Sequence, residues 1–300
     1  MPATQGTARR GARRPADDVI VAQDQRRDAV LRVIGAARKR LILSVFRCDD
    51  LEVIDGLADA LRRKVRVEIL ITSRAKGWRQ RLQRLWVLLE SMGATLHRYA
   101  DPVVKYHAKY IVADQGPALV ASLNLTRKCF TSTVDFVVTT YDPGVVSGLT
   151  RLFDADCGKS EVPLPRGLSK RLIVGPEDAR SQFTALIEGA RRSIRLIDPD
   201  VTDPAIVARL KAKGAAGVEV SLLSRGNLHG MTPHGKLLII DGVTAVIGSV
   251  SLSALSLDFR REMAIVVDDA GCIARLNTLF GPADILDGSR PTHPRRSATR

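Results

Sequence analysis

Two stretches of the sequence share one pattern: YHAKYIVADQGPALVASLNLT, residues 106–126, and PHGKLLIIDGVTAVIGSVSLS, residues 233–253. In each stretch a histidine is followed by a lysine two positions later and by an aspartate seven positions later. Lys and Asp are each roughly one residue in twenty of average composition, so a given histidine meets both by chance about once in four hundred. Two matches in a chain with five histidines therefore indicate a duplicated unit. The members of the two sets are His107, Lys109, Asp114 and His234, Lys236, Asp241.

The duplication extends beyond this pattern. IGAARKRLIL, from Ile34, aligns with IEGARRSIRL, from Ile187, and VRVEILIT aligns with VEVSLLSR at the same shift. The shift between the two histidine motifs is smaller, so the second half lacks a segment between its VEV strand and its motif. Each half predicts a helix, a strand, a helix, a strand and then a strand pair that carries the motif. This alternation is typical of an α/β layered domain.

The additional residues of the first half include WRQRLQRLWVLLESMGATLHRY, residues 78–99. Apolar residues at helical spacing predict an amphipathic helix that packs on the core, and Gly93 is expected to end it before a strand. The alternative is a lid that grips lipid or nucleic acid through arginines on other faces of the helix. The apolar residues are Leu82, Leu85, Trp86 and Leu89, and the arginines are Arg79, Arg81 and Arg84.

Composition predicts where the two units begin and end. Both chain ends are basic, low in apolar residues and contain Pro and Gly, which is typical of disordered tails. The segment CGKSEVPLPRGLSK carries the Pro and Gly residues of a linker. We therefore expect a tail at 1–17, a first half at 18–156, a linker at 157–170, a second half at 171–285 and a tail at 286–300.

The chain of 300 residues has a formal net charge of +14 and an isoelectric point near 10.1. This charge favours a polyanionic partner, either nucleic acid or an anionic membrane surface. The aromatic share of 4% disfavours an extended base-stacking platform. Four widely spaced cysteines, with no CxxC pair, are expected to be reduced thiols. Without a signal peptide or a membrane-spanning run, we expect a soluble, cytoplasmic protein that contacts membranes at most peripherally.

Strand geometry predicts which side chains of the motifs lie together. Successive side chains of a strand point to opposite faces, so the histidine and lysine of each motif share one face. Two-residue turns at Gln115-Gly116 and Gly242-Val243 would place four neutral donors opposite these residues. Lys109 would lie opposite Ser122, His107 opposite Asn124, Lys236 opposite Ser249 and His234 opposite Ser251.

This set of groups suits a phosphate diester, because lysines neutralise the non-bridging oxygens and Ser or Asn donate hydrogen bonds to them. One histidine would attack phosphorus and the other would protonate the leaving oxygen, so two facing halves complete one site. Asp135 and Glu262, which follow their motif histidines at equal spacing, are the candidate carboxylates that hold the imidazoles. Asp114 and Asp241 precede turns, so we expect them to be structural. We expect no metal and no cofactor.

At these residues the chain resembles the phospholipase D superfamily, whose signature H-x-K-x4-D continues into G-S-x-N. The resemblance covers residues 18 to 285 and implies two α/β sandwich halves related by a pseudo-two-fold axis, with one metal-independent active site in a monomer. Three residues depart from the family pattern, namely Ala121 for Gly, Ser251 for Asn and Asp135 for the commoner Glu. Family habit points to His107 as the nucleophile.

The resemblance leaves the substrate open. We rank first the cleavage or transfer of the phosphatidyl group of phospholipids through a phosphohistidine. The alternatives are a metal-independent nuclease that acts on DNA or RNA, and an inactive relative that only binds polyanions.

Overall fold

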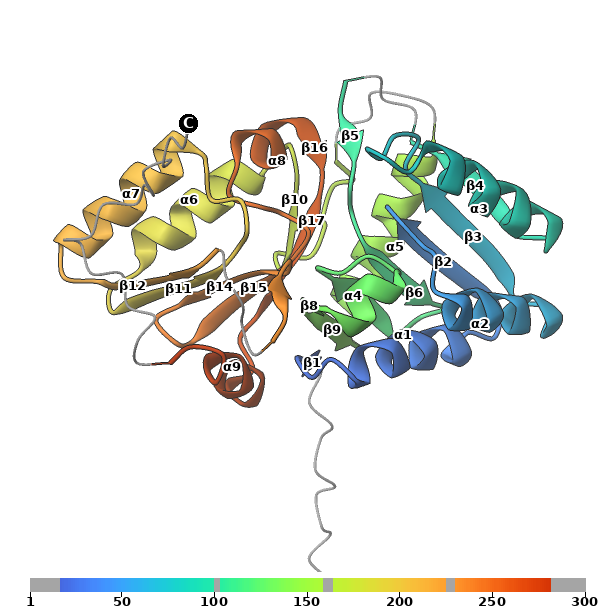
Figure 1. Ribbon diagram of the computed structural model, residues 1–300, viewed down its shortest axis with the longest axis horizontal. Helices are drawn as coiled ribbons and strands as arrows, with labels where there is room; N and C mark the ends of the chain where they lie inside the picture. The colour runs from blue at the N-terminus through green and yellow to red at the C-terminus, as the bar shows by residue number, and fades with distance from the viewer. Residues whose placement is uncertain (1–16, 100–102, 159–163, 225–229, 282–300) are drawn as a thin grey trace, which may run out of the picture.

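The computed structural model describes residues 17–99, 103–158, 164–224 and 230–281. These residues form two α/β halves that lie side by side (Figure 1). Each half contains one mixed β-sheet, and helices cover its faces. Most of the two expected basic tails lies outside the described residues, as do His229, His293 and residues 159–163 of the expected linker.

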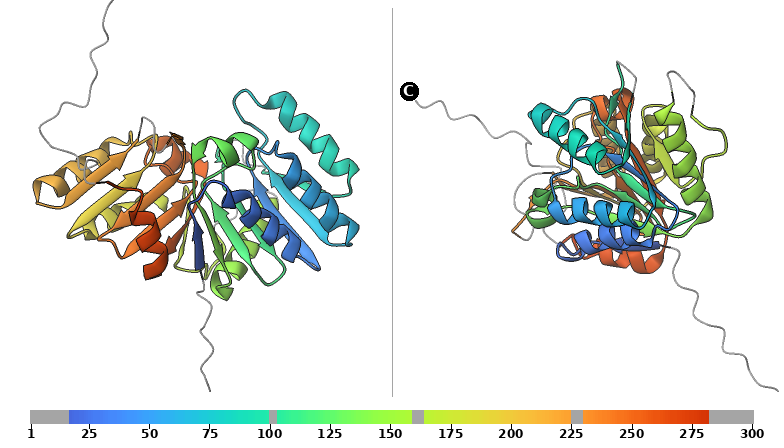
Figure 2. Two further views of the ribbon diagram at one scale, coloured as in Figure 1. Left: turned by 60° about the horizontal axis from the view of Figure 1, so that its bottom comes forward. Right: turned by 90° about the vertical axis from the view of Figure 1, so that its right-hand side faces the viewer.

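The sheet of the first half has seven strands in the order β1-β9-β7-β6-β2-β3-β4. Helices α1, α2 and α3 cover one face of this sheet and α5 covers the other (Figure 2, right). The bounds of the strands are β1 Asp17–Ile20, β2 Arg40–Val45, β3 Arg66–Ile71, β4 Thr95–Arg98, β6 Tyr110–Ala113, β7 Ala118–Ala121 and β9 Val137–Thr140. The helices are α1 Gln25–Ala36, α2 Leu51–Arg62, α3 Arg79–Ser91, α4 Arg127–Thr131 and α5 Pro143–Cys157.

The sheet of the second half has six strands in the order β10-β17-β15-β14-β11-β12. Its outer face packs against α6, α7 and α8, and α9 lies on the face toward the first half. The strands are β10 Leu172–Val174, β11 Ser193–Ile197, β12 Glu219–Leu223, β14 Lys236–Ile240, β15 Thr244–Gly248 and β17 Met263–Val267. The helices are α6 Ala179–Gly189, α7 Pro204–Ala215, α8 Ala254–Phe259 and α9 Ala270–Asn277.

The two strand orders correspond position by position, which confirms the duplication inferred from the sequence. β1, β9, β7, β6, β2 and β3 match β10, β17, β15, β14, β11 and β12 in that order, and β4 is the additional strand. The segment missing from the second half is thus the one that forms α3 and β4 in the first. The expected amphipathic helix is α3, whose Leu82, Leu85 and Leu89 are buried. Gly93 follows it with φ +95, a conformation that favours glycine.

Three apolar cores hold the molecule together. One lies under α1, α2 and α3 of the first half, and another under α6, α7 and α8 of the second. The third lies between the two sheets and contains side chains of both halves, from Phe153 of α5 to Ile247 of β15 and Leu276 of α9. The halves therefore share apolar surface that would be exposed to water if they separated.

Asp114 and Asp241 have the structural role that their positions before turns predicted. The carboxylate of Asp114 accepts hydrogen bonds from the backbone N–H groups of residues 38–40, at 2.7–2.8 Å. Asp241 accepts from the N–H groups of residues 191–193, at 2.6–3.1 Å. Each aspartate thus links the hairpin that carries its motif to the start of a neighbouring strand, β2 in the first half and β11 in the second. The N–H bonds lower the pKa of both carboxyls, despite the opposing effect of burial.

The predicted register of both hairpins is wrong by one residue. Lys236 lies opposite Gly248, and not opposite Ser249. In the first half Tyr110 lies opposite Val120, which brings Lys109 opposite Ala121. The reason is the turn, since Asp114 and Asp241 adopt positive φ, 49 and 54, and enter the loop themselves. Each loop is therefore longer than a two-residue turn, and a shift of one residue moves the partners to the other face of the sheet.

Within the described residues, no helix is both long enough and apolar enough to cross a membrane.

The two halves differ in how closely β15 and β7 approach their neighbours. A Cβ atom added to Gly248 would collide with the carbonyl oxygen of Met263 and with the backbone of Ala264. The equivalent position of the first half is occupied by Ala121, which is buried without such a clash. The Gly-to-Ala departure from the family pattern is thus accommodated in the first half only.

We predict that Gly248→Ala lowers the free energy of unfolding by at least about 2 kcal/mol, because the backbone of β17 must move. The matched change Ala121→Gly should cost only about 1 kcal/mol. Denaturant unfolding of both variants measures the difference. Equal effects of the two substitutions would contradict this account of the β15–β17 contact.

Candidate active site

Two short parallel ribbons join the halves and lead to the motif histidines. β5 (Lys105–Tyr106) pairs with β16 (Arg260–Arg261), and β8 (Thr133–Val134) pairs with β13 (Thr232–Pro233). Figure 1 shows β5 and β16 side by side between the halves. Each ribbon pairs the strand before a motif histidine with the strand before the carboxylate of the other half. Sequence-distant residues thus become neighbours.

The first ribbon delivers His107 to Glu262. The backbone N–H of His107 donates to the carbonyl oxygen of Arg261 at 2.8 Å, and its ring Nδ1 lies 2.8 Å from Oε2 of Glu262. Glu262 is fully buried, and Ser256 donates to its other oxygen at 2.9 Å. The side chain of His107 is 15% exposed.

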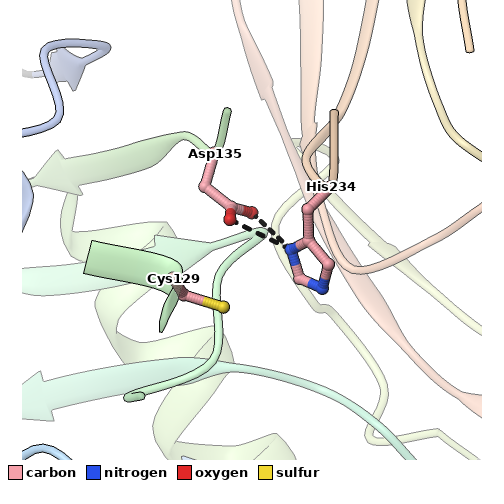
Figure 3. Close-up of side chains that lie close together, drawn as sticks. All are labelled: Cys129, Asp135 and His234. Atoms are coloured by element: carbon pink, nitrogen blue, oxygen red, sulfur yellow. Dashed lines mark hydrogen bonds and ion pairs between the residues drawn. The ribbon is translucent and has the colours of Figure 1, made fainter. Parts of the chain in front are cut away.

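The second ribbon delivers His234 to Asp135 in the same way. The N–H of His234 donates to the carbonyl oxygen of Val134 at 3.2 Å, and Nδ1 lies 2.9 and 3.0 Å from the two oxygens of Asp135. Figure 3 shows the imidazole reaching across to the carboxylate. Ser122 and Thr133 donate to Asp135 at 2.7 and 2.6 Å. These two hydrogen bonds fix the carboxylate of Asp135, whose side chain is one methylene shorter than that of the equivalent Glu262.

Each lysine binds the backbone of its own motif. Nζ of Lys109 donates to the carbonyl oxygen of His107 at 2.7 Å, and Nζ of Lys236 donates to that of His234 at 2.6 Å. Lys109 also lies 3.2 Å from Nε2 of His107. The charge of Lys236 acts on both His107 and Lys109. The structure therefore gathers the predicted histidines, lysines and carboxylates of both halves around one place.

Burial and mutual contact determine the charges of His107 and Glu262. Burial lowers the pKa of His107 to about 3, with Lys109 adding to the effect and Glu262 opposing it. Burial would raise the pKa of Glu262, but His107 and its hydrogen bonds lower it to about 2. Near neutral pH the pair is thus a carboxylate beside a neutral imidazole. Because a carboxylate only accepts, Nδ1 carries the proton and the lone pair is on Nε2.

The other ionisable groups of the site are also shifted. Burial lowers the pKa of Lys109 to about 7, with Lys236 acting in the same direction and Glu262 in the opposite one. Burial opposes ionisation of Asp135, but His234 and the hydroxyls of Thr133 and Ser122 give a net lowering of its pKa. Both buried carboxylates are therefore anions that hold an imidazole.

Three of the four predicted phosphate donors form hydrogen bonds to other groups of the protein that the sequence did not predict. Ser122 donates to Asp135, and the hydroxyl of Ser249 accepts from the backbone N–H of Met263 at 3.1 Å and donates to its carbonyl oxygen at 3.4 Å. Ser251 donates to Asp198 at 2.6 Å, a partner that the sequence patterns did not reveal. Asn124 is buried, and its Oδ1 has no hydrogen-bond partner in the described part of the chain. A direct phosphate contact from these four side chains stays a prediction.

One cysteine completes a group of three possible metal ligands that the spacing of the sequence did not indicate. The Sγ of Cys129, a carboxylate oxygen of Asp135 and a ring nitrogen of His234 lie within 4.8 Å of one another (Figure 3). When His107 is aligned with His234, Cys129 is equivalent to Ser256, whose hydroxyl donates to Glu262. The thiol thus stands where the other half has the hydroxyl that holds its carboxylate.

Known proteins resemble this chain in sequence and in fold. A family model described as "Cardiolipin synthase, PLD-like domain" matches residues 30–157. Cardiolipin synthase A proteins from three strains of Pseudomonas aeruginosa are 29% identical over 170 residues, which are 56% of this chain and 32% of theirs. The aligned segment is thus about one third of the length of these relatives.

Two solved structures have the same fold. Polyphosphate kinase from Porphyromonas gingivalis superposes with a TM-score of 0.71 and 20% identity, over 87% of this chain and 46% of the kinase. Phosphatidylserine synthase from Haemophilus influenzae superposes with a TM-score of 0.70 and 9% identity, over 88% of this chain and 85% of the synthase. The family match over residues 30–157 and the curated relatives agree with the resemblance to the phospholipase D superfamily that the motifs predicted.

We predict that His107 remains neutral, with its proton on Nδ1, from pH 8 down to pH 5. Its lowered pKa places protonation well below that range. The ¹⁵N shifts of the ring nitrogens in histidine-labelled protein report this state directly. Glu262→Gln, which removes the acceptor charge, should weaken the preference for the Nδ1–H tautomer. Titration of His107 near 6.5, the ordinary value, would contradict the proposed burial of the pair.

Proposed function

We propose that this protein is a phospholipase D-type phosphodiesterase that cleaves the phosphatidyl group of phospholipids or transfers it to an acceptor alcohol. The observation that carries the proposal is the pair of imidazoles, each fixed by a buried carboxylate of the opposite half beside a lysine. The description of the matching family and the names of the curated relatives support a phospholipid substrate. The structural neighbours support only the fold, since they include a kinase as well as a lipid synthase.

The two histidines have different roles in this proposal. His107 is the nucleophile, because it is the more buried imidazole and keeps a lone pair on Nε2. His234 is the general acid, because its side chain is 33% exposed and can exchange a proton with the solvent, and Asp135 orients its ring through both oxygens. This assignment agrees with the habit of the family.

The reaction proceeds in two displacements. Nε2 of His107 attacks phosphorus and forms a P–N bond, while the P–O bond to the leaving alcohol breaks and His234 gives that oxygen its proton. His234 then takes a proton from water or from an acceptor alcohol, whose oxygen attacks phosphorus and breaks the P–N bond. Lys109 and Lys236 neutralise the non-bridging oxygens in both steps. The carboxylates keep both rings in the tautomer that the steps require.

We predict that His107→Asn and His234→Asn each reduce turnover of a phospholipid by about a thousandfold or more, and that the double variant is little worse. Members of one catalytic unit are non-additive, because either loss already stops the reaction. With a p-nitrophenyl leaving group, which needs no proton, His234→Asn should still form the acid-labile phosphoryl adduct and His107→Asn should not. Independent residual activities of the two single variants would indicate two separate sites.

A nuclease is the second candidate, which the net charge of +14 favours. A panel of phosphatidylcholine, phosphatidylglycerol, bis(p-nitrophenyl) phosphate and single- and double-stranded DNA separates the two. We expect cleavage of phospholipid, and faster cleavage when anionic lipid is mixed into the vesicles. Cleavage of nucleic acid alone, with binding that falls steeply with salt, would promote the nuclease. Binding without cleavage of any diester would indicate an inactive polyanion-binding protein.

A further inference from the structure

Three cations gather beside His107, and two of them lie over the ring of Phe46. The ring centroid of Phe46 lies 4.3 Å from that of His107. The guanidinium carbon of Arg47 lies 5.1 Å from the Phe46 centroid, and Nζ of Lys105 lies 5.5 Å from it. Arg260 lies opposite Lys105 in the ribbon that joins the halves. These three residues, Arg47, Lys105 and Arg260, are called the basic cluster below.

The basic cluster has little negative charge of its own. Arg260 lies 3.6 Å from Glu262, the carboxylate that already holds His107. Among the described residues neither Arg47 nor Lys105 forms an ion pair, and the Nε atoms of Arg47 and Arg260 are buried without an acceptor. Like charges directly opposite each other on paired strands are unfavourable. The pKa of Lys105 is accordingly lowered by burial and then by the charges of Arg260 and Arg47.

The second half shows that the fold does not require these cations. When the two motifs are aligned, Lys105 and Arg260 correspond to Thr232 and Thr133, which lie opposite each other in the other ribbon. Arg47 corresponds to Asp200 in the alignment that matches Ile34 with Ile187. The second ribbon delivers His234 to Asp135 equally well, with two threonines in place of two cations. The basic cluster must therefore serve something other than the histidine–carboxylate pair.

We propose that the basic cluster binds a second phosphate group of the substrate, next to the phosphate diester that reacts at His107. The inference rests on the proposed function and specifies it: the preferred lipid carries a further phosphate on its headgroup. Arginine and lysine are the cationic side chains that bind phosphate oxygens in proteins, and the charge of three such residues exceeds what one carboxylate, Glu262, can neutralise. A shallow depression lined by Ser73, Arg74 and Lys105 adjoins the cluster.

The basic cluster has no counterpart at the equivalent positions of the second half, which favours a lipid headgroup over a nucleic acid strand. A strand that passes through the site presents phosphates on both sides of the bond that is cleaved, so a nuclease needs cations on both sides. Here the equivalent positions beyond His234 are Thr133, Thr232 and Asp200. One additional phosphate on one side fits this distribution.

The binding of inorganic pyrophosphate tests the basic cluster without any turnover. Wild-type protein should bind pyrophosphate about tenfold more tightly than orthophosphate, because the second phosphate gains charged hydrogen bonds. Lys105→Thr and Arg260→Thr, which introduce the residues of the other ribbon, should each abolish this preference in calorimetry. The control Arg66→Gln removes an exposed arginine from the first position of β3 and should retain it. An equal affinity for both anions, or an equal effect of the control, would overturn the site.

Vesicle assays then test whether the second phosphate belongs to a lipid headgroup. Wild-type protein should cleave phosphatidylglycerol phosphate about tenfold faster than phosphatidylglycerol at equal surface density. Both threonine variants should lose this ratio, and Arg66→Gln should keep it. Preference for pyrophosphate without preference between the lipids would assign the site to a free phosphate compound and overturn the lipid assignment.

Two further outcomes separate this inference from the proposed function. A loss of oligonucleotide cleavage in the threonine variants would overturn the lipid assignment in favour of a nucleic acid strand. Failure to cleave any lipid would refute the proposed function, whereas the pyrophosphate titration would still decide the basic cluster.

Discussion

A buried carboxylate that loses its partner costs several kcal/mol, and this protein contains two such carboxylates at the contact between its halves. Glu262 of the second half is bonded to His107 of the first, and Asp135 of the first is bonded to His234 of the second. Neither pair can form within one copy of the repeat. Separating the halves would leave two buried anions unpaired and expose the apolar core between the sheets. The same contacts that hold the halves together therefore orient the groups proposed for catalysis.

The duplication allows the two copies to be compared within one molecule. Residues that both copies share serve the fold or the common site, and residues found in one copy alone serve a function of that copy. Both copies keep the histidine, the lysine, the buried acid and the aspartate that fastens the hairpin. The copies differ in two respects. His107 is more buried than His234, and one ribbon carries Lys105 and Arg260 whereas the other carries threonines. A symmetric frame thus holds an asymmetric site, which agrees with the proposed reaction, in which one histidine is the nucleophile and the other the acid.

Much of this arrangement could be predicted from the sequence. The repeat, the α/β class, helix α3 and the carboxylates all follow from spacing and periodicity, because these patterns are local or recur at a fixed shift. The register of the hairpins could not be predicted, since it depends on Asp114 and Asp241 adopting positive φ. The crossing of each carboxylate to the other half, the bond from Ser251 to Asp198 and the place of Cys129 beside Asp135 depend on packing between distant segments.

The central claim is that both halves form one reaction centre, and a structure with bound vanadate, which mimics the transition state of phosphoryl transfer, tests it most directly. We expect vanadium bonded to Nε2 of His107, with Nε2 of His234 directed at the oxygen on the opposite side and both lysines at the equatorial oxygens. Vanadate held by the histidine and lysine of one half alone, with the other imidazole turned away, would contradict the account.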